Sequence, residues 1–235
     1  MRSMGRPKRA DAAGHSFHML NRANLRATIF EEDADYEAFE EILDEALERF
    51  KIELFAYCLM PNHYHLLVRP GEDGEMGRFG HYLGLTHTQR YYTQRYHAHY
   101  NTAGMGHVYQ GRFKSFPVQS DEHFLTVARY VERNAYAAEL CERPEDWKFG
   151  NLRHWQPKTK AFSQRISSWP IRRTPNWDQV VATNFSEPER DRLNGSVKRG
   201  VPLGNETWVA HIARTFDWES TRSPRGRPRK QSASK

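Results

Sequence analysis

The sequence has only two cysteines, Cys58 and Cys141, and they lie in different segments without a C-x-x-C spacing. A disulfide framework or a cysteine-based zinc site is therefore not expected. No apolar run approaches the roughly 20 residues that a membrane-spanning helix needs. The basic residues 1–9 are not followed by the apolar segment of a secretory signal. These absences predict a cytoplasmic protein that does not associate with a membrane.

Acidic residues are missing from both ends of the chain. Residues 1–9 hold four basic residues and residues 221–235 hold six, neither with an acid, so the middle is nearly neutral although the whole chain carries +6. Basic arms on such a body are typical of proteins that bind polyanions, because phosphate contacts give affinity for any sequence. Tails that only maintain solubility are the alternative interpretation.

Hydrophobic periodicity divides the chain into alternating strands and helices. Apolar positions at helical spacing predict helices over residues 33–50, about 79–96 and 121–140. Alternating or fully apolar runs predict strands over residues 15–22, 52–60, 63–69 and 109–119. The resulting order β-α-β-β-α-β, with an extra helix, predicts an α+β fold of the ferredoxin-like sandwich type.

Composition predicts four regions along the chain. A flexible basic arm over residues 1–14 precedes a catalytic domain over residues 15–157. Residues 158–220 form a linker and a small helical appendage, with helices expected at 187–198 and 205–216. Residues 221–235 are expected to be a disordered basic tail, because they combine many charges with proline and glycine.

The triplet His63-Tyr64-His65 is the strongest chemical signal. Side chains alternate along a strand, so the two imidazoles should share one face while Tyr64 faces the other way. Imidazoles two residues apart can bind one metal ion together. An accidental H-x-H is the alternative, and His97-Ala98-His99, which has no flanking apolar strand, is read as solvated.

A second set of candidates lies further along the chain. Tyr130 and Asn134 are four residues apart and should share one helix face, where a hydroxyl and an amide oxygen could meet a metal and a phosphate. Arg112 and Lys114 would share a strand face and could hold phosphates beside a cut. A tyrosine at the core edge and an ordinary solvated strand face are the structural alternatives.

Three segments together resemble a known family. The runs 60–68 (MPNHYHLLV), 110–115 (QGRFKS) and 129–134 (RYVERN) are similar to the REP-associated tyrosine transposases, single-tyrosine members of the HUH endonuclease superfamily. The resemblance implies that His63, His65 and Asn134 bind Mg²⁺ or Mn²⁺. It also implies that Tyr130 attacks the DNA backbone, which leaves a 5′-phosphotyrosine and a free 3′-OH that can later rejoin strands. Arg22 stands near a family-like N-terminal motif.

The expected partner is single-stranded DNA that carries hairpins, bound by a monomer or a homodimer associated with the nucleoid. In the tail, residues 224–230 (PRGRPRK) look like an AT-hook, whose Arg225 and Arg227 would enter the minor groove. Two alternative functions remain open. One is a DNA-binding regulator of the same fold that does not cut, and the other is a hydrolytic metal-dependent phosphodiesterase.

Overall fold

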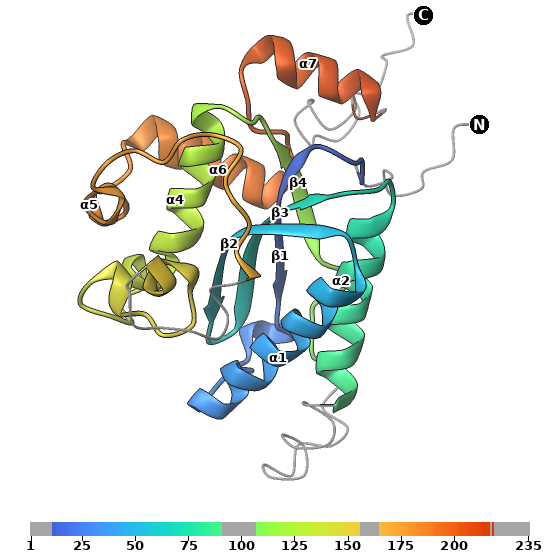
Figure 1. Cartoon of the computed structure of the whole chain (residues 1–235), viewed down its shortest axis with the longest axis vertical. Coiled ribbons are helices and arrows are strands. Elements are labelled where there is room, and N and C mark those ends of the chain that lie inside the picture. The colour runs from blue at the N-terminus through green and yellow to red at the C-terminus, as the bar shows by residue number, and fades with distance from the viewer. Residues whose placement is uncertain (1–10, 91–106, 156–164, 217, 219–235) are drawn as a thin grey trace, which may run out of the picture.

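The centre of the molecule is one four-stranded antiparallel sheet with the strand order β2-β3-β1-β4. It comes from a computed structural model that describes residues 11–90, 107–155, 165–216 and 218. The strands are β1 (Ser16–Arg22), β2 (Ile52–Met60), β3 (His63–Pro70) and β4 (Lys114–Val118). Helices α1 (Asp33–Arg49) and α2 (Glu75–Thr86) cover one face, and α4 (Glu122–Ala137) covers the other (Figure 1). The predicted ferredoxin-like α+β sandwich is confirmed.

Helix α1 begins with a reciprocal cap. The Glu32 side chain accepts from the backbone of Asp35, and the Asp35 side chain accepts in turn from the backbone N–H of Glu32. Asp33 is the first residue of the helix, and Glu32 before it is the cap. The apolar stripe of α1, which includes Phe39 and Leu43, is buried against the sheet as expected.

Two apolar cores flank the sheet, which is why β2 and β3 are buried on both faces. On the side of α1 and α2, Phe17 and Tyr64 from the sheet pack with Phe39. On the side of α4, Leu67 and Phe116 belong to a separate cluster. Residues 61–62 form the predicted turn between β2 and β3. Strand alternation therefore sends neighbouring residues of β3 into different chemical environments.

The C-terminal region adds further helices to the sheet domain. They are α5 (Trp177–Ala182), α6 (Glu187–Arg199) and α7 (Glu206–Thr215), of which only α5 was not predicted. Trp177 and Leu193 share one apolar cluster with Val127 of α4. The buried carboxylate of Glu132 accepts from Trp177 Nε1 and from Asn151 Nδ2 at 2.5 Å. Helices α5 and α6 thus share a core with α4 (Figure 1).

The fourth strand is shorter than the sequence predicted. It begins at Lys114, whereas Tyr109 makes only an isolated bridge with Ala23. Between them Gly111 has a φ of 149°, a backbone conformation that side chains rarely allow, and the chain bends there. Arg112 consequently lies in the bend before β4 and not on a strand face with Lys114.

Two helix ends also differ from the prediction. Helix α2 ends at Thr86 and is followed by a π-helical turn through Arg90, while the predicted continuation to residue 96 lies outside the described residues. His97 and His99 lie outside them as well. Helix α4 ends at Ala137, three residues before the predicted end at Leu140. In the described part of the chain, every helix is too short or too polar to span a bilayer.

Candidate active site

His63 and His65 lie on the same face of β3, and their ring centroids are 4.9 Å apart. Tyr64 points to the opposite face, where it is fully buried in the core of α1 and α2. The alternation predicted from the H-Y-H triplet is therefore confirmed. Both imidazoles face the side of the sheet that α4 covers.

A third histidine, His18 of β1, supports His65 from the neighbouring strand. His18 Nε2 lies 2.8 Å from His65 Nδ1, and the two rings stack with their centroids 5.0 Å apart. Both side chains are buried. Their meeting depends on the pairing of Leu20 with His65, because side chains two residues apart on β1 share a face. The sequence reasoning missed His18, since a lone histidine in a strand gives no sign of its cross-strand partner.

The hydrogen bonds leave one nitrogen of each candidate ligand available. His63 Nδ1 lies 2.6 Å from Asn62 Oδ1, an oxygen that can only accept, so His63 carries its proton on Nδ1. His65 Nε2 is buried and has no hydrogen-bond partner among the described residues. When His65 Nδ1 donates to His18, the lone pair of Nε2 is free. Asn62 and His18 are thus the orienting partners that metal-binding histidines usually have.

Burial keeps these imidazoles neutral. Burial, followed by the nearby Arg22 charge, lowers the pKa of His63 to about 4. Burial is also the main cause that lowers the pKa of His65 well below its usual value and that of His18 to about 3. A metal ion binds imidazole only in its deprotonated form. The histidines are therefore in the metal-binding state at neutral pH without having to release a proton.

Tyr130 of α4 lies against both buried histidines. Its ring meets His65 edge-on at a centroid distance of 5.5 Å and an angle of 89°, and meets His18 at 5.8 Å and 73°. Neighbouring α4 residues Val127 and Val131 are fully buried and fix the helix on the sheet. The predicted tyrosine thus stands beside the predicted histidine pair.

Arg22 contributes a positive charge to this site. It ends β1 opposite His63 in the strand register, and its Nε is buried without a partner among the described residues. Burial raises the pKa of Tyr130, while the positive charge of Arg22 acts in the opposite direction. An arginine that is near both a phenol and a metal site can stabilise phenolate and phosphate charge.

Asn134 lies one helical turn beyond Tyr130. Its Nδ2 donates to the Tyr130 carbonyl oxygen at 2.7 Å, which leaves the amide Oδ1 as the atom a cation could use. With Tyr130 it lines a hollow of about 570 Å³ whose other wall includes Asn184 and Phe185, from the segment between α5 and α6. Phe185 lies 6.5 Å from the Tyr130 ring. No described hydrogen bond joins Asn134 to His63, so its role as third ligand stays a prediction.

The family model described as "Transposase IS200 like" matches residues 12–134. The chain belongs to this family. It is therefore a DNA transposase with a tyrosine nucleophile, and the resemblance drawn from the sequence is confirmed at the level of this family.

Two solved structures are similar to this transposase. One is described as a REP-associated tyrosine transposase bound to a REP hairpin, with 14% identity, a TM-score of 0.53, and coverage of 78% of this chain and 96% of that one. The other is a transposase candidate from Deinococcus radiodurans R1, with 19% identity, a TM-score of 0.39, and coverage of 55% and 96%. At these identities the first likeness supports the fold alone. No curated protein matches the chain.

The remaining predicted DNA contacts of the transposase fall in different places. Lys114 pairs with Leu20 on β1 and so lies on the face of the sheet that bears His18. Arg112 lines a hollow beside α2, on the other side. Arg225 and Arg227 lie outside the described residues.

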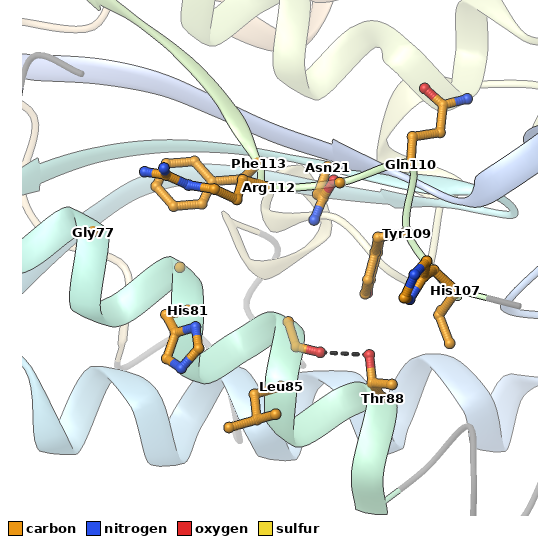
Figure 2. A pocket seen from close by; sticks show the side chains of 14 residues that line it. Asn21, Gly77, His81, Leu85, Thr88, His107, Tyr109, Gln110, Arg112 and Phe113 are labelled. Atoms are coloured by element: carbon orange, nitrogen blue, oxygen red, sulfur yellow. Dashed lines mark hydrogen bonds between the residues drawn. The ribbon is translucent and has the colours of Figure 1, made fainter. Parts of the chain in front are cut away.

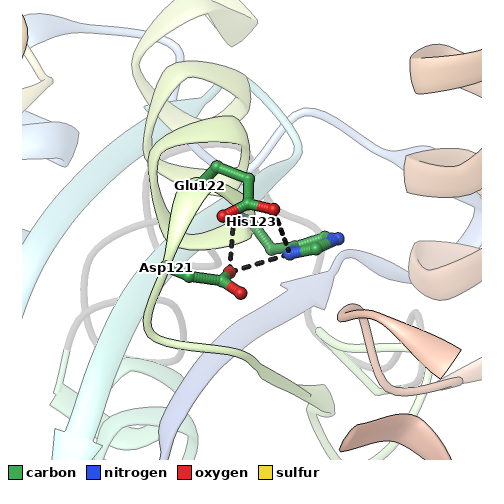
Figure 3. A group of neighbouring side chains, drawn as sticks. All are labelled: Asp121, Glu122 and His123. Carbon is green, nitrogen blue, oxygen red and sulfur yellow. Dashed lines mark hydrogen bonds and ion pairs between the residues drawn. The ribbon is translucent and has the colours of Figure 1, made fainter. Parts of the chain in front are cut away.

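A separate cluster of acidic and histidine side chains stands at the start of α4 (Figure 3). The nearest potential ligand atoms of Asp121, Glu122 and His123 lie within 4.8 Å of one another. Asp121 Oδ1 accepts from the His123 backbone nitrogen at 2.9 Å and lies 2.7 Å from His123 Nδ1. These contacts are those of a helix cap, and they account for the cluster without a metal ion.

Proposed function

We propose that this transposase cuts and rejoins single-stranded DNA through a covalent bond between Tyr130 and a 5′-phosphate. Mg²⁺ or Mn²⁺ would be held by His63 and His65, with Asn134 as the third protein ligand. One observation carries the proposal: the Tyr130 ring stands edge-on to His65, whose buried Nε2 has no hydrogen-bond partner among the described residues.

The donor set fits a divalent ion. A buried imidazole nitrogen without a partner costs free energy, and a metal ion would remove that cost. Asn62 and His18 hold the two rings so that Nε2 of each can act as the ligand. Imidazole and amide oxygen together suit Mn²⁺, and Mg²⁺ with additional water. When bound, the ion supplies positive charge that polarises a phosphate.

The chain itself would supply the nucleophile and its environment. The Tyr130 hydroxyl oxygen forms a bond to phosphorus while the bond from phosphorus to the 3′-oxygen breaks. The phenol releases its proton to solvent, and the departing 3′-oxygen takes one up. Burial raises the pKa of Tyr130, so the phenol is protonated at neutral pH, and the nearby Arg22 favours its ionisation. A DNA 3′-OH reverses the step and joins two strands without another energy source.

The substrate would be DNA with a hairpin beside a single-stranded cut site. The similar solved structure holds a REP hairpin, which supports the same class of substrate for this chain. Arg22 and Lys114, on the same face of the sheet as the histidines, would contact the strand at the cut. Arg112 would contact DNA away from it, and Arg225 and Arg227 would bind duplex DNA next to the hairpin. Nucleoid association and a monomeric or homodimeric state stay predictions.

The direct test uses hairpin DNA labelled at its 3′ end, because the 3′ fragment is the one that becomes attached to the protein. With Mn²⁺, the wild-type chain should give a labelled protein band on a denaturing gel, and Tyr130→Phe should give none. Tyr136→Phe is the matched control, because Tyr136 lies on the same helix and stacks on Arg133 outside the site.

Other outcomes would support the two alternative functions. A regulator that does not cut would bind the hairpin tightly and give neither adduct nor cleavage product. A hydrolytic phosphodiesterase would release free 5′-phosphate, and its cleavage would survive Tyr130→Phe. Either result would contradict the tyrosine mechanism.

A further inference from the structure

A second hollow lies on the other face of the sheet from Tyr130 and the histidine pair. It has a volume of about 690 Å³ and separates α2 from the segment 107–113 that leads into β4 (Figure 2). We call it the α2 pocket. Figure 2 shows His81 and Leu85 of α2, with Thr88 from the turn that follows it, on one side, and Asn21 and Tyr109 facing them. None of the roles assigned above to the catalytic residues uses this space.

Glycines of α2 keep the pocket open. Gly77, Gly80 and Gly84 all line it, although glycine inside a helix costs about 1 kcal/mol relative to alanine. At Gly80 packing explains the choice, because an added Cβ would lie 2.3 Å from the Phe113 ring. At Gly84 it does not, because an added Cβ would meet no atom of the described residues within 4 Å. The gap at Gly84 is therefore a feature of the pocket and is not required by the core.

A buried amide points into this gap. Asn21 of β1 is only 7% exposed, and its Oδ1 accepts from the backbone nitrogen of Arg22 at 3.0 Å. Its Nδ2 has no hydrogen-bond partner among the described residues, and in Figure 2 this nitrogen faces the open space above α2. This N–H group opens onto the pocket, so it can donate to an acceptor atom of a ligand bound there.

The lining identifies the kind of ligand. It contains no acidic residue, and it includes the exposed cation Arg112 and two histidines, His81 and His107. Tyr109 and Phe113 contribute aromatic rings. Flat apolar walls, an amide that can bond to a polar edge and a cation at the rim are what an unpaired nucleobase with its phosphate requires.

We infer that the α2 pocket binds one unpaired base of the DNA substrate, a few nucleotides from the cut. The inference rests on the proposed function for the DNA. Asn21 and Arg22 are neighbours on β1 and face opposite sides of the sheet, Asn21 toward the pocket and Arg22 toward the catalytic tyrosine. The backbone of Gln110 bonds to Arg22 at 3.0 Å, so the pocket wall is attached to the end of the catalytic strand. A single strand of DNA that leaves the catalytic face of the sheet can reach the α2 pocket by passing around β4, which is an edge strand of the sheet.

The experiment fills the pocket by substitution. Gly84→Leu places a side chain in the gap, and its higher helix propensity should keep α2 stable. Gly195→Leu is the matched control: Gly195 is also inside a helix, α6, where an added Cβ would meet none of the described atoms within 4 Å, and it lines neither hollow. Each full-length variant is titrated with hairpin DNA that has a single-stranded flank, and with a series of the same DNA in which one flanking nucleotide at a time lacks its base.

For wild type and Gly195→Leu, removal of one particular base should weaken binding about 10-fold, which is within the range that stacking on a single base supplies. Gly84→Leu should bind intact DNA about 10-fold more weakly and lose no further affinity when that base is removed. The inference is overturned if Gly84→Leu binds intact DNA like wild type. It is also overturned if, at every flanking position, the affinity lost by removing the base adds to the affinity lost by Gly84→Leu. Because the readout is binding, a chain that binds in this way but forms no Tyr130 adduct would refute the proposed chemistry alone.

Discussion

His18→Met is the substitution that most sharply tests how the metal site is built. In the wild type, His18 Nε2 is 2.8 Å from His65 Nδ1 inside a buried pair. Methionine has a similar volume but offers no comparable acceptor. Without a metal ion, the His65 of the variant can move its proton from Nδ1 to Nε2. Metal binding would then force the proton back onto a buried Nδ1 that has no partner. The variant should therefore bind the metal ion more weakly.

The size of this effect follows from two independent estimates. A buried donor without a partner costs about 1–3 kcal/mol. Loss of an orienting partner from a metal-binding histidine costs about 10–100-fold in affinity, which is about 1.4–2.7 kcal/mol. The two ranges agree, so we expect the Kd of Mn²⁺ for His18→Met to rise about 10–100-fold.

The assay is a titration of the full-length chain with Mn²⁺, in which the EPR signal of the free ion gives the bound fraction. His18→Gln is the matched control, because its amide oxygen can accept from His65 Nδ1 near the position of the imidazole nitrogen. It should recover most of the affinity. Unchanged affinity in His18→Met, or equal losses in both variants, would refute an orienting role for His18.

Three further predictions concern the stability of the fold. Glu132→Leu should lower the free energy of unfolding in urea by about 2–6 kcal/mol, because it leaves the buried donors Trp177 Nε1 and Asn151 Nδ2 without their acceptor, at about 1–3 kcal/mol each; a variant as stable as wild type would contradict the role of these contacts in holding the appendage. Gly80→Ala should destabilise the chain by about 1–3 kcal/mol through its clash with the core, whereas Gly84→Ala should stabilise it by up to about 1 kcal/mol, and thermal melts that reverse this order would exclude the packing described for α2. Burial lowers the pKa of His87 from 6.5 to about 3, so its contribution to stability is complete above pH 6.5 and falls by about 1.4 kcal/mol per pH unit as the pH decreases through that window. His87→Gln should show a shallower pH dependence of urea unfolding, and identical slopes would argue against a buried neutral imidazole.

Local patterns were enough to predict that side chains alternate along β3 and that Tyr130 lies on a helix. His63 and His65 share a face because a strand repeats every two residues, and this is independent of the rest of the fold. The meeting of His65 with Tyr130 followed from the family resemblance, because nothing local in either segment specifies that α4 crosses that face of the sheet.

Features that depend on long-range pairing could not be read from one sequence. His18 reaches His65 only through the register of β1 against β3. Phe185 comes to the nucleophile from more than 50 residues further along the chain, across the packing of the appendage on α4. The early start predicted for β4 failed for a local reason, because Gly111 bends the chain before Lys114.

We expect the Tyr130 hydroxyl to become covalently attached to DNA during the reaction. Mass spectrometry of the protease-digested adduct, formed with hairpin DNA and Mn²⁺, tests it directly. A nucleotide should be attached through a 5′-phosphate to the peptide that contains Tyr130, and to no other tyrosine. A nucleotide found on a different residue, or cleaved DNA without any protein-linked nucleotide, would contradict it.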